Sequence, residues 1–240
     1  VMSGPTQLIN TLATSQALAK KVAEGLGVKP SRHDLAAVPV ERLLEAQSAF
    51  MPAGMGFDAT PDPEALAASF AEGALPLTPN VDGDLIPVAP LEAIRGGAGS
   101  DVDLLMGTTA EEFNMMFAMR GDDVGEQVLA RALTNLGLSG DKVRTYTSAH
   151  SDMPDGAMLG QGLTDYMFRV PTVRLAEARA HADAPSFTYE FRWVSPALGG
   201  LLGSAHCLDI PFVFDNLDAE GVETVAGPGA PAELARTMHD

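Results

Sequence analysis

Residues 102–107, Val102-Asp103-Leu104-Leu105-Met106-Gly107, are the stretch that decides the fold class. This short apolar run is bounded by Gly and Ser, which is typical of a buried strand in a parallel sheet. Residues 186–193, Ser-Phe-Thr-Tyr-Glu-Phe-Arg-Trp, alternate aromatic and polar side chains and predict a second strand. Helices are predicted between the two, at 125–136 and 162–181. Strands separated by helical stretches predict an α/β fold with a parallel sheet.

The flanking sequence adds further elements. Apolar spacing predicts a helix over 6–28 that is ended by Gly27. The turn residues at 80–84 predict a tight hairpin, with Gly83 in a positive-φ conformation. Residues 208–214 are apolar and predicted to be buried, whereas the Gly-, Pro- and Ala-rich segment 219–231 is predicted to be a surface loop.

Composition excludes several classes of function. The chain has 240 residues, with 32 acidic and 15 basic side chains and a formal net charge of −17. This charge argues against binding to nucleic acid or to an anionic membrane surface. The single cysteine, Cys207, excludes an internal disulfide, which slightly favours the cytoplasm, although many exported bacterial proteins also lack disulfides.

Neither a nucleotide nor a metal cofactor is indicated. The sequence has no G-x-x-x-x-G-K-S/T phosphate loop and no G-x-G-x-x-G that opens a helix after a strand. The five histidines show no H-x-x-x-H or H-E-x-x-H spacing. We therefore expect no cofactor.

Glu112 and His206 are the candidate reactive pair. Each follows one of the two predicted strands, and in open α/β sheets catalytic groups collect beyond the carboxyl ends of strands. A carboxylate bonded to one ring nitrogen would fix the tautomer of His206 and allow the other nitrogen to act as a general base. Position alone leaves open the alternative of an ordinary loop glutamate and a structural histidine.

Four segments, which follow one another along the chain in the same order as in the family, resemble the type-B carboxylesterases, the carboxylesterase/cholinesterase group of α/β-hydrolases. Gly107-Thr108-Thr109-Ala110-Glu111-Glu112-Phe113 resembles the acid-bearing loop of that family. The histidine loop is matched by Trp193-Val194-Ser195-Pro196-Ala197-Leu198-Gly199-Gly200 and by residues 203–214, from Gly203-Ser204-Ala205-His206 to Phe214. Residues 80–87 are similar to its V-D-G-x-x-[LI]-P segment, and 165–171 to its D-x-x-F-x-x-P helix. The match is most similar to bacterial, para-nitrobenzyl-esterase-like members.

The resemblance implies a place in the site for each of five residues. Glu112 would be the acid of a Ser-Glu-His triad and His206 its general base, while Glu111 occupies the position before the acid. Ser3, within Met2-Ser3-Gly4, would lie near the triad without being the nucleophile, and Asp209 stands where the family commonly has glutamate.

The nucleophile of that family lies in a G-x-S-x-G elbow, which occurs nowhere in these residues. The resemblance therefore implies that residues 1–240 are the C-terminal portion of a single α/β-hydrolase catalytic domain, truncated at both ends. They would hold the last strands of a mostly parallel sheet with long helical insertions. By itself such a chain is expected to be inactive without the N-terminal half, and the whole protein is expected to hydrolyse small-molecule carboxylic esters.

Some nearby residues have two interpretations. Met116, Phe117 and Trp193 could line a substrate pocket, but packing in the core is the simpler expectation for each. Cys207 replaces the usual glycine after the histidine and suggests a thiol nucleophile, yet a small packed residue is favoured. Phe113 replaces the usual glycine after the acid.

Two other functions remain as alternatives. A catalytically inactive, esterase-like interaction module would typically lack a member of the triad, whereas both Glu112 and His206 are present here. A generic acidic α/β scaffold is disfavoured by the four ordered motifs.

Overall fold

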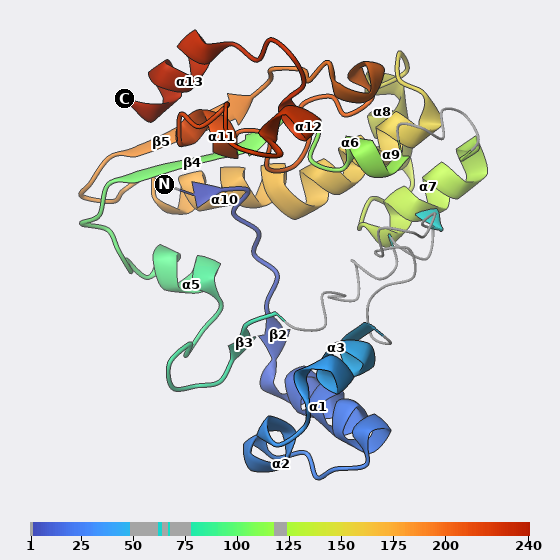
Figure 1. Cartoon of the computed structure of the whole chain (residues 1–240), viewed down its shortest axis with the longest axis vertical. Coiled ribbons are helices and arrows are strands. Elements are labelled where there is room, and N and C mark those ends of the chain that lie inside the picture. Colours follow the sequence, from blue (N-terminus) through green and yellow to red (C-terminus); the bar gives the residue numbers. More distant parts are fainter. Residues whose placement is uncertain (1, 49–61, 64–66, 68–77, 118–123) are drawn as a thin grey trace.

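The structure, a computed structural model, describes residues 2–48, 62, 63, 67, 78–117 and 124–240. Its central sheet has three strands in the order β1-β4-β5, formed by Met2–Ser3, Leu104–Thr109 and Ser186–Phe191 (Figure 1). Both neighbouring pairs are parallel, so the prediction of a parallel sheet is confirmed. The chain is thus part of an α/β fold, and β4 begins and ends two residues later than the predicted strand.

At one point a side chain of β5 lies over the backbone of β4. Gly107 pairs with Tyr189, and the Tyr189 ring covers it. A Cβ atom placed on Gly107 would lie 2.4 Å from the Tyr189 ring carbons, too close for any side chain. Glycine at this position therefore allows the tyrosine ring to lie against the middle strand.

The long connection from β4 to β5 is helical. It contains α6 (Asn114–Phe117), α7 (Glu126–Asn135), α8 (Asp141–Ala149) and α9 (Asp155–Thr164). One π-helical turn, Asp165–Arg169, then joins α9 to α10 (Val170–Ala178) in a continuous rod, which matches most of the predicted helix at 162–181. The largest core cluster lies among these helices and includes Phe117, Leu133, Leu159 and Leu163.

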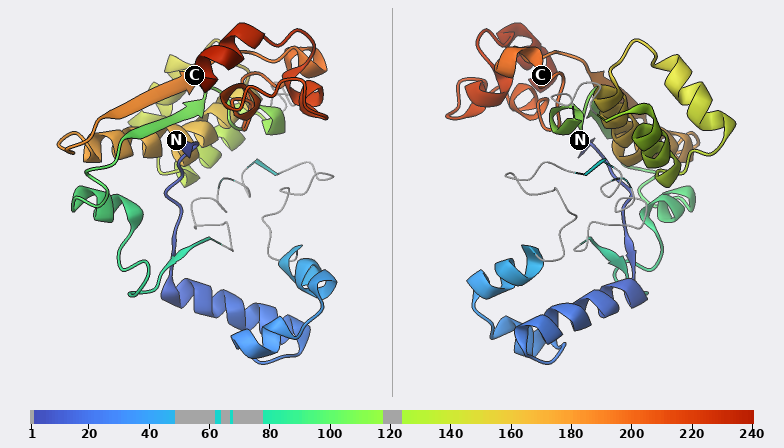
Figure 2. Two further views of the ribbon diagram at one scale, coloured as in Figure 1. Left: turned by 60° about the vertical axis from the view of Figure 1, so that its left-hand side comes forward. Right: turned by 90° about the vertical axis from the view of Figure 1, so that its right-hand side faces the viewer.

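The segment after β5 packs on the opposite side of the sheet from α10, as Figures 1 and 2 show. It contains a 3-10 turn at Ala197–Gly200, then α11 (Ile210–Val213), α12 (Val222–Ala226) and α13 (Ala232–His239). Phe191 and Phe212 are buried in a second core cluster there. The predicted loop at 219–231 was partly wrong, because Val222–Ala226 is helical and Ala226 is buried in that cluster.

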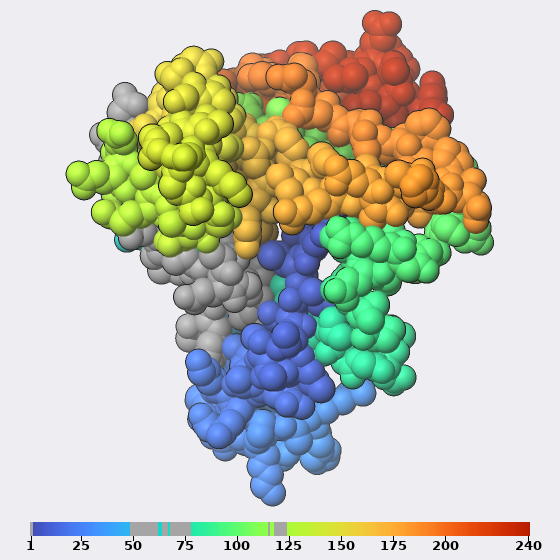
Figure 3. All heavy atoms as spheres, turned by 180° about the vertical axis from the view of Figure 1, so that it is seen from behind, coloured from blue at the N-terminus to red at the C-terminus, as the bar shows by residue number. Residues whose placement is uncertain are grey.

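Residues 10–48 extend away from the sheet (Figures 2 and 3). They form β2 (Asn10–Thr11), α1 (Leu12–Leu26), α2 (Arg32–Ala36) and α3 (Val40–Ser48). Helix α1 ends at Gly27 with φ of 71°, as predicted, but it begins six residues later than predicted, after a Thr11 cap.

The hairpin predicted at 80–84 is wrong. Strand β3 (Asn80–Val81) pairs in parallel with β2, and α5 (Pro90–Arg95) follows it. The local turn chemistry is nevertheless present. Gly83 has φ of 81°, and the Asp82 carboxylate accepts hydrogen bonds from the backbone N–H groups of Asp84 and Ile86. Turn residues specify local geometry, but the strand partner came from elsewhere in the chain.

Within the described part of the chain, none of the helices combines the length and the apolar character needed to cross a bilayer.

Candidate active site

Glu112 lies in a tight turn immediately after β4. Its side chain is buried, and its Oε1 accepts a hydrogen bond of 2.8 Å from the backbone N–H of Thr109, the last residue of that strand. The turn is also held from other sides. The Ala110 N–H donates to the Phe191 carbonyl oxygen at the end of β5 (2.9 Å), and the Phe113 N–H donates to Thr164 Oγ1 (3.3 Å). The acid is therefore pre-positioned by backbone contacts to two elements.

His206 meets Glu112 although 94 residues separate them in sequence. The imidazole Nδ1 lies 2.6 Å from Glu112 Oε2, so the two carboxylate oxygens serve two different partners. The imidazole also stacks on the Phe168 ring, with centroids 5.2 Å apart. The His206 side chain is 49% exposed, whereas that of Glu112 is 1% exposed. A buried carboxylate thus orients a histidine whose Nε2 contacts no polar partner among the described residues.

The pKa of His206 is raised above its ordinary value. The main cause is the hydrogen bond to Glu112, followed by the charges of Glu112 and Asp209, while burial acts in the opposite direction. The site therefore stabilises the imidazolium that a general base becomes once it has taken a proton.

Ser3 and Asp209 are brought together beside this pair. The Asp209 side chain is completely buried, and its Oδ2 accepts hydrogen bonds from Ser3 Oγ (2.6 Å) and from the Tyr189 hydroxyl (2.7 Å). Burial and the hydrogen bond to Asp209 raise the pKa of Tyr189, so the phenol remains a proton donor. A Cβ on Gly4, next to Ser3, would be 3.8 Å from Glu112 Oε1, which places this cluster against the acid.

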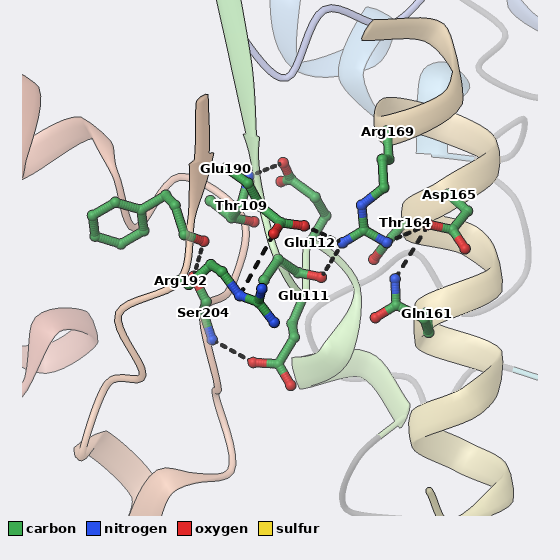
Figure 4. A network of polar contacts seen from close by, with 12 residues as sticks. Thr109, Glu111, Glu112, Gln161, Thr164, Asp165, Arg169, Glu190, Arg192 and Ser204 are labelled. Atoms are coloured by element: carbon green, nitrogen blue, oxygen red, sulfur yellow. Dashed lines mark hydrogen bonds and ion pairs between the residues drawn. The ribbon is translucent and has the colours of Figure 1, made fainter. Parts of the chain in front are cut away.

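A network of charged groups surrounds the acid turn (Figure 4). Arg169, from the π-helical turn, donates to the Ala110 carbonyl oxygen (3.0 Å) and pairs with both Glu190 (2.9 Å) and Asp165. Arg169 joins the α9–α10 rod to β5 and to residue 110, so it gives the turn that carries Glu112 a second contact with that rod.

Three weaker candidates lie in the hydrophobic cores. Phe117 is completely buried in the larger cluster, and Met116 packs against the same cluster. Trp193 packs on Phe212 in the second cluster, with ring centroids 5.2 Å apart. These contacts favour core packing, and a place for the three residues in a substrate pocket stays a prediction.

Cys207 has features that disfavour a nucleophilic thiolate. Its pKa is raised, first by desolvation and then by the negative charges of Asp209 and Glu112. A reactive cysteine needs the reverse, a pKa lowered by nearby positive charge. Its φ of 66° lies in the left-handed region. This geometry explains why glycine would suit the position after the histidine.

Some contacts of the site could not be anticipated from the sequence. Phe168, Arg169 and Tyr189 lie within the predicted helix or strand, and periodicity alone did not distinguish them from packing residues. The phenylalanine of the D-x-x-F-x-x-P segment, Phe168, was the one available signal, because the pairing of Tyr189 with Gly107 appears only in the folded structure. Among the described residues, no group of three or more His, Cys, Asp or Glu side chains converges as a metal site would require.

The sequence is similar to known esterases over most of its length. The family model described as "Carboxylesterase family" matches residues 1–225. A para-nitrobenzyl esterase from Bacillus subtilis (strain 168) is 31% identical over 163 residues, which cover 67% of this chain and 32% of the relative. A phenmedipham hydrolase from Pseudarthrobacter oxydans is 29% identical over 246 residues, covering 96% of this chain and 44% of the relative.

Solved structures have the same architecture. The Geobacillus stearothermophilus carboxylesterase EST55 at pH 6.2 matches 99% of this chain and 46% of its own chain, with a TM-score of 0.72 and 26% identity. A structure described as a PNB esterase matches 99% of this chain and 45% of its own, with a TM-score of 0.72 and 25% identity. The chain therefore spans less than half the length of each of these four proteins.

Proposed function

The chain belongs to the carboxylesterase family, and we propose that it supplies the acid and the histidine of a Ser-Glu-His triad that hydrolyses carboxylic esters. The hydrogen bond of 2.6 Å between His206 Nδ1 and the buried carboxylate of Glu112 carries this proposal. Members of the family are α/β-hydrolases, and the parallel order β1-β4-β5 with helices on both faces fits the last part of such a sheet.

The nucleophilic serine is proposed to lie outside residues 1–240. The sequence has no G-x-S-x-G elbow, and the chain covers under half of its relatives. We infer that residues 1–240 are the C-terminal portion of one catalytic domain and that the remainder of the sheet is needed for turnover. Purified residues 1–240 should therefore not hydrolyse para-nitrophenyl butyrate, and serine-dependent turnover by this piece would refute the inference.

The geometry supports a defined sequence of proton transfers. Neutral His206 takes the proton of the serine hydroxyl as that oxygen attacks the ester carbonyl, and it later gives the proton to the leaving alcohol. A water molecule then repeats the cycle on the acyl-enzyme. Throughout, Glu112 holds Nδ1 as a donor, so that Nε2 faces the substrate, and its charge stabilises the imidazolium. Small-molecule esters are the proposed substrates, in line with the name of the Bacillus subtilis relative.

The test is carried out in the whole protein that contains this chain. His206→Ala should reduce kcat for para-nitrophenyl butyrate by about 10³-fold or more, because the variant lacks the base that takes the proton of the serine. His33→Ala, on the outlying helix α2, is the matched control and should retain the parent rate. A His206→Ala variant with the kcat of the parent would rule out the triad. The alternative of an esterase-like module whose function is binding would instead be favoured if the whole protein itself failed to hydrolyse the ester, and the intact Glu112–His206 pair offers no support for it.

A further inference from the structure

Glu111, the neighbour of the acid, reaches across to the histidine loop. Its Oε2 accepts a hydrogen bond of 2.7 Å from the backbone N–H of Ser204, and its own N–H donates to the Ser204 carbonyl oxygen at 3.1 Å. Figure 4 shows this contact beside Glu112. Residue 204 is two positions before His206, and residue 111 is one position before Glu112. The two loops are therefore joined next to the groups that must meet.

Ser204 itself is fixed on its remaining sides. It is completely buried, and its hydroxyl donates to the Phe191 carbonyl oxygen at the end of β5, at 2.6 Å. The preceding residue, Gly203, accepts at its carbonyl oxygen a hydrogen bond from the Ser195 N–H at 3.0 Å. The histidine loop is thus hydrogen-bonded to β5 on one side and to Glu111 on the other.

Gly203 shows how closely Glu111 approaches this loop. Its φ is 63°, a conformation that favours glycine, and a Cβ atom there would lie 2.1 Å from Glu111 Oε2. Any side chain at 203 would displace the carboxylate. The contact therefore depends on residues on both loops, as expected of a built contact and not of a surface glutamate that happens to lie nearby.

We propose that Glu111 is a positioning residue for His206, which sets the distance between the histidine loop and the acid turn. This inference rests on the proposed roles of Glu112 and His206. A carboxylate is suited to this task because a charged acceptor binds a backbone N–H more strongly than a neutral one. The two adjacent glutamates thus divide the work: Glu112 binds the imidazole, and Glu111 binds the backbone that carries it.

The test uses four variants of the whole protein, assayed with para-nitrophenyl butyrate. Glu111→Ala removes the acceptor and should lower kcat by about 10- to 100-fold, since a displacement of about 1 Å can cost this much, with KM changed by less than about threefold. Glu111→Gln retains an acceptor and should restore kcat to within about threefold of the parent. Glu126→Ala, on the exposed start of α7, is the control for loss of a glutamate. His206→Ala is assayed alongside.

The pH dependence of kcat/KM distinguishes positioning from a merely structural role. Weakening the Glu112 bond, the main cause of the raised pKa of His206, should move the acidic limb to lower pH in Glu111→Ala and leave it unmoved in Glu111→Gln. If Glu111→Ala fails to fold, Glu111→Asp replaces it, because its shorter side chain keeps the charge but loses the reach to Ser204. It should then show the same lowered kcat and shifted limb.

The outcomes separate this inference from the proposed function. If His206→Ala is inactive but Glu111→Ala, or Glu111→Asp in its place, has the kcat and the pH profile of the parent, Glu111 has no positioning role. A raised KM with unchanged kcat would likewise overturn that role. If His206→Ala retains the parent rate, the proposed function itself fails, and the role of Glu111 fails with it.

Discussion

Replacing Glu112 by glutamine tests the chemistry of the site most directly, because the structure predicts which way the amide must face. One carboxylate oxygen accepts the Thr109 N–H at 2.8 Å and the other lies 2.6 Å from His206 Nδ1. In Glu112→Gln the amide oxygen must face Thr109, because the Thr109 N–H is a donor and needs an acceptor. The amide NH₂ then faces Nδ1 and forces it to be an acceptor. The proton moves to Nε2, which can no longer act as a base.

The size of the effect follows from the same contacts. Opposite charges about 4 Å apart attract by roughly 4 kcal/mol at an effective dielectric constant of about 20. Solvent reaches the imidazole, which is 49% exposed, and weakens this attraction, while the wrong tautomer adds to the barrier. If the screening by solvent and the cost of the wrong tautomer offset each other, the variant loses about 4 kcal/mol of transition-state stabilisation, which corresponds to a fall in kcat of about 10³-fold.

The assay is steady-state hydrolysis of para-nitrophenyl butyrate by the whole protein, with thermal unfolding recorded on the same samples. Glu112→Gln keeps the shape of the side chain, so its unfolding temperature should stay close to that of the parent. Glu126→Gln, the same chemical change on the surface of α7, is the control and should be fully active. A Glu112→Gln variant with kcat within about tenfold of the parent would refute the tautomer argument.

Three further predictions concern stability. Gly107→Ala should lower the free energy of unfolding by about 3 kcal/mol in chemical denaturation, because its Cβ would lie 2.4 Å from the Tyr189 ring. The control Gly25→Ala, in α1 with open space around it, should raise the free energy of unfolding by about 0.5–1 kcal/mol. Equal effects would contradict the close contact between Gly107 and the ring. Residue 207 has φ of 66°, so Cys207→Gly should be at least as stable as the parent and Cys207→Val less stable by about 1–2 kcal/mol. A Cys207→Val variant with the stability of the parent would argue against that backbone conformation. The fold raises the pKa of His206, so the stabilisation from its protonated form is fully present below the unfolded-state pKa and is lost as the pH rises through the folded-state pKa. In urea unfolding, His206→Asn should therefore lose more free energy of unfolding, relative to the parent, at about pH 5.5 than at about pH 9. A loss that does not depend on pH would contradict the raised pKa.

The fold class could be predicted because burial and local geometry leave periodic signals. The apolar run at 102–107 and the alternation at 186–193 correspond to β4 and β5, and Gly27 does end α1. The partners of short strands were not predictable in the same way. Residues 80–81 pair with Asn10–Thr11. A strand of two residues carries too little of a side-chain pattern to predict its partner.

For the candidate site, the sequence by itself determined which residue types are available and that Glu112 and His206 each follow a strand. Only the tertiary structure decided how they meet: through one carboxylate oxygen, with the other held by Thr109 and with Glu111 bound to the backbone of Ser204. The physical reason is that strand position depends on a local pattern of side chains. The distance between two loops 94 residues apart depends instead on the packing of the elements between them and on backbone hydrogen bonds that no residue type specifies.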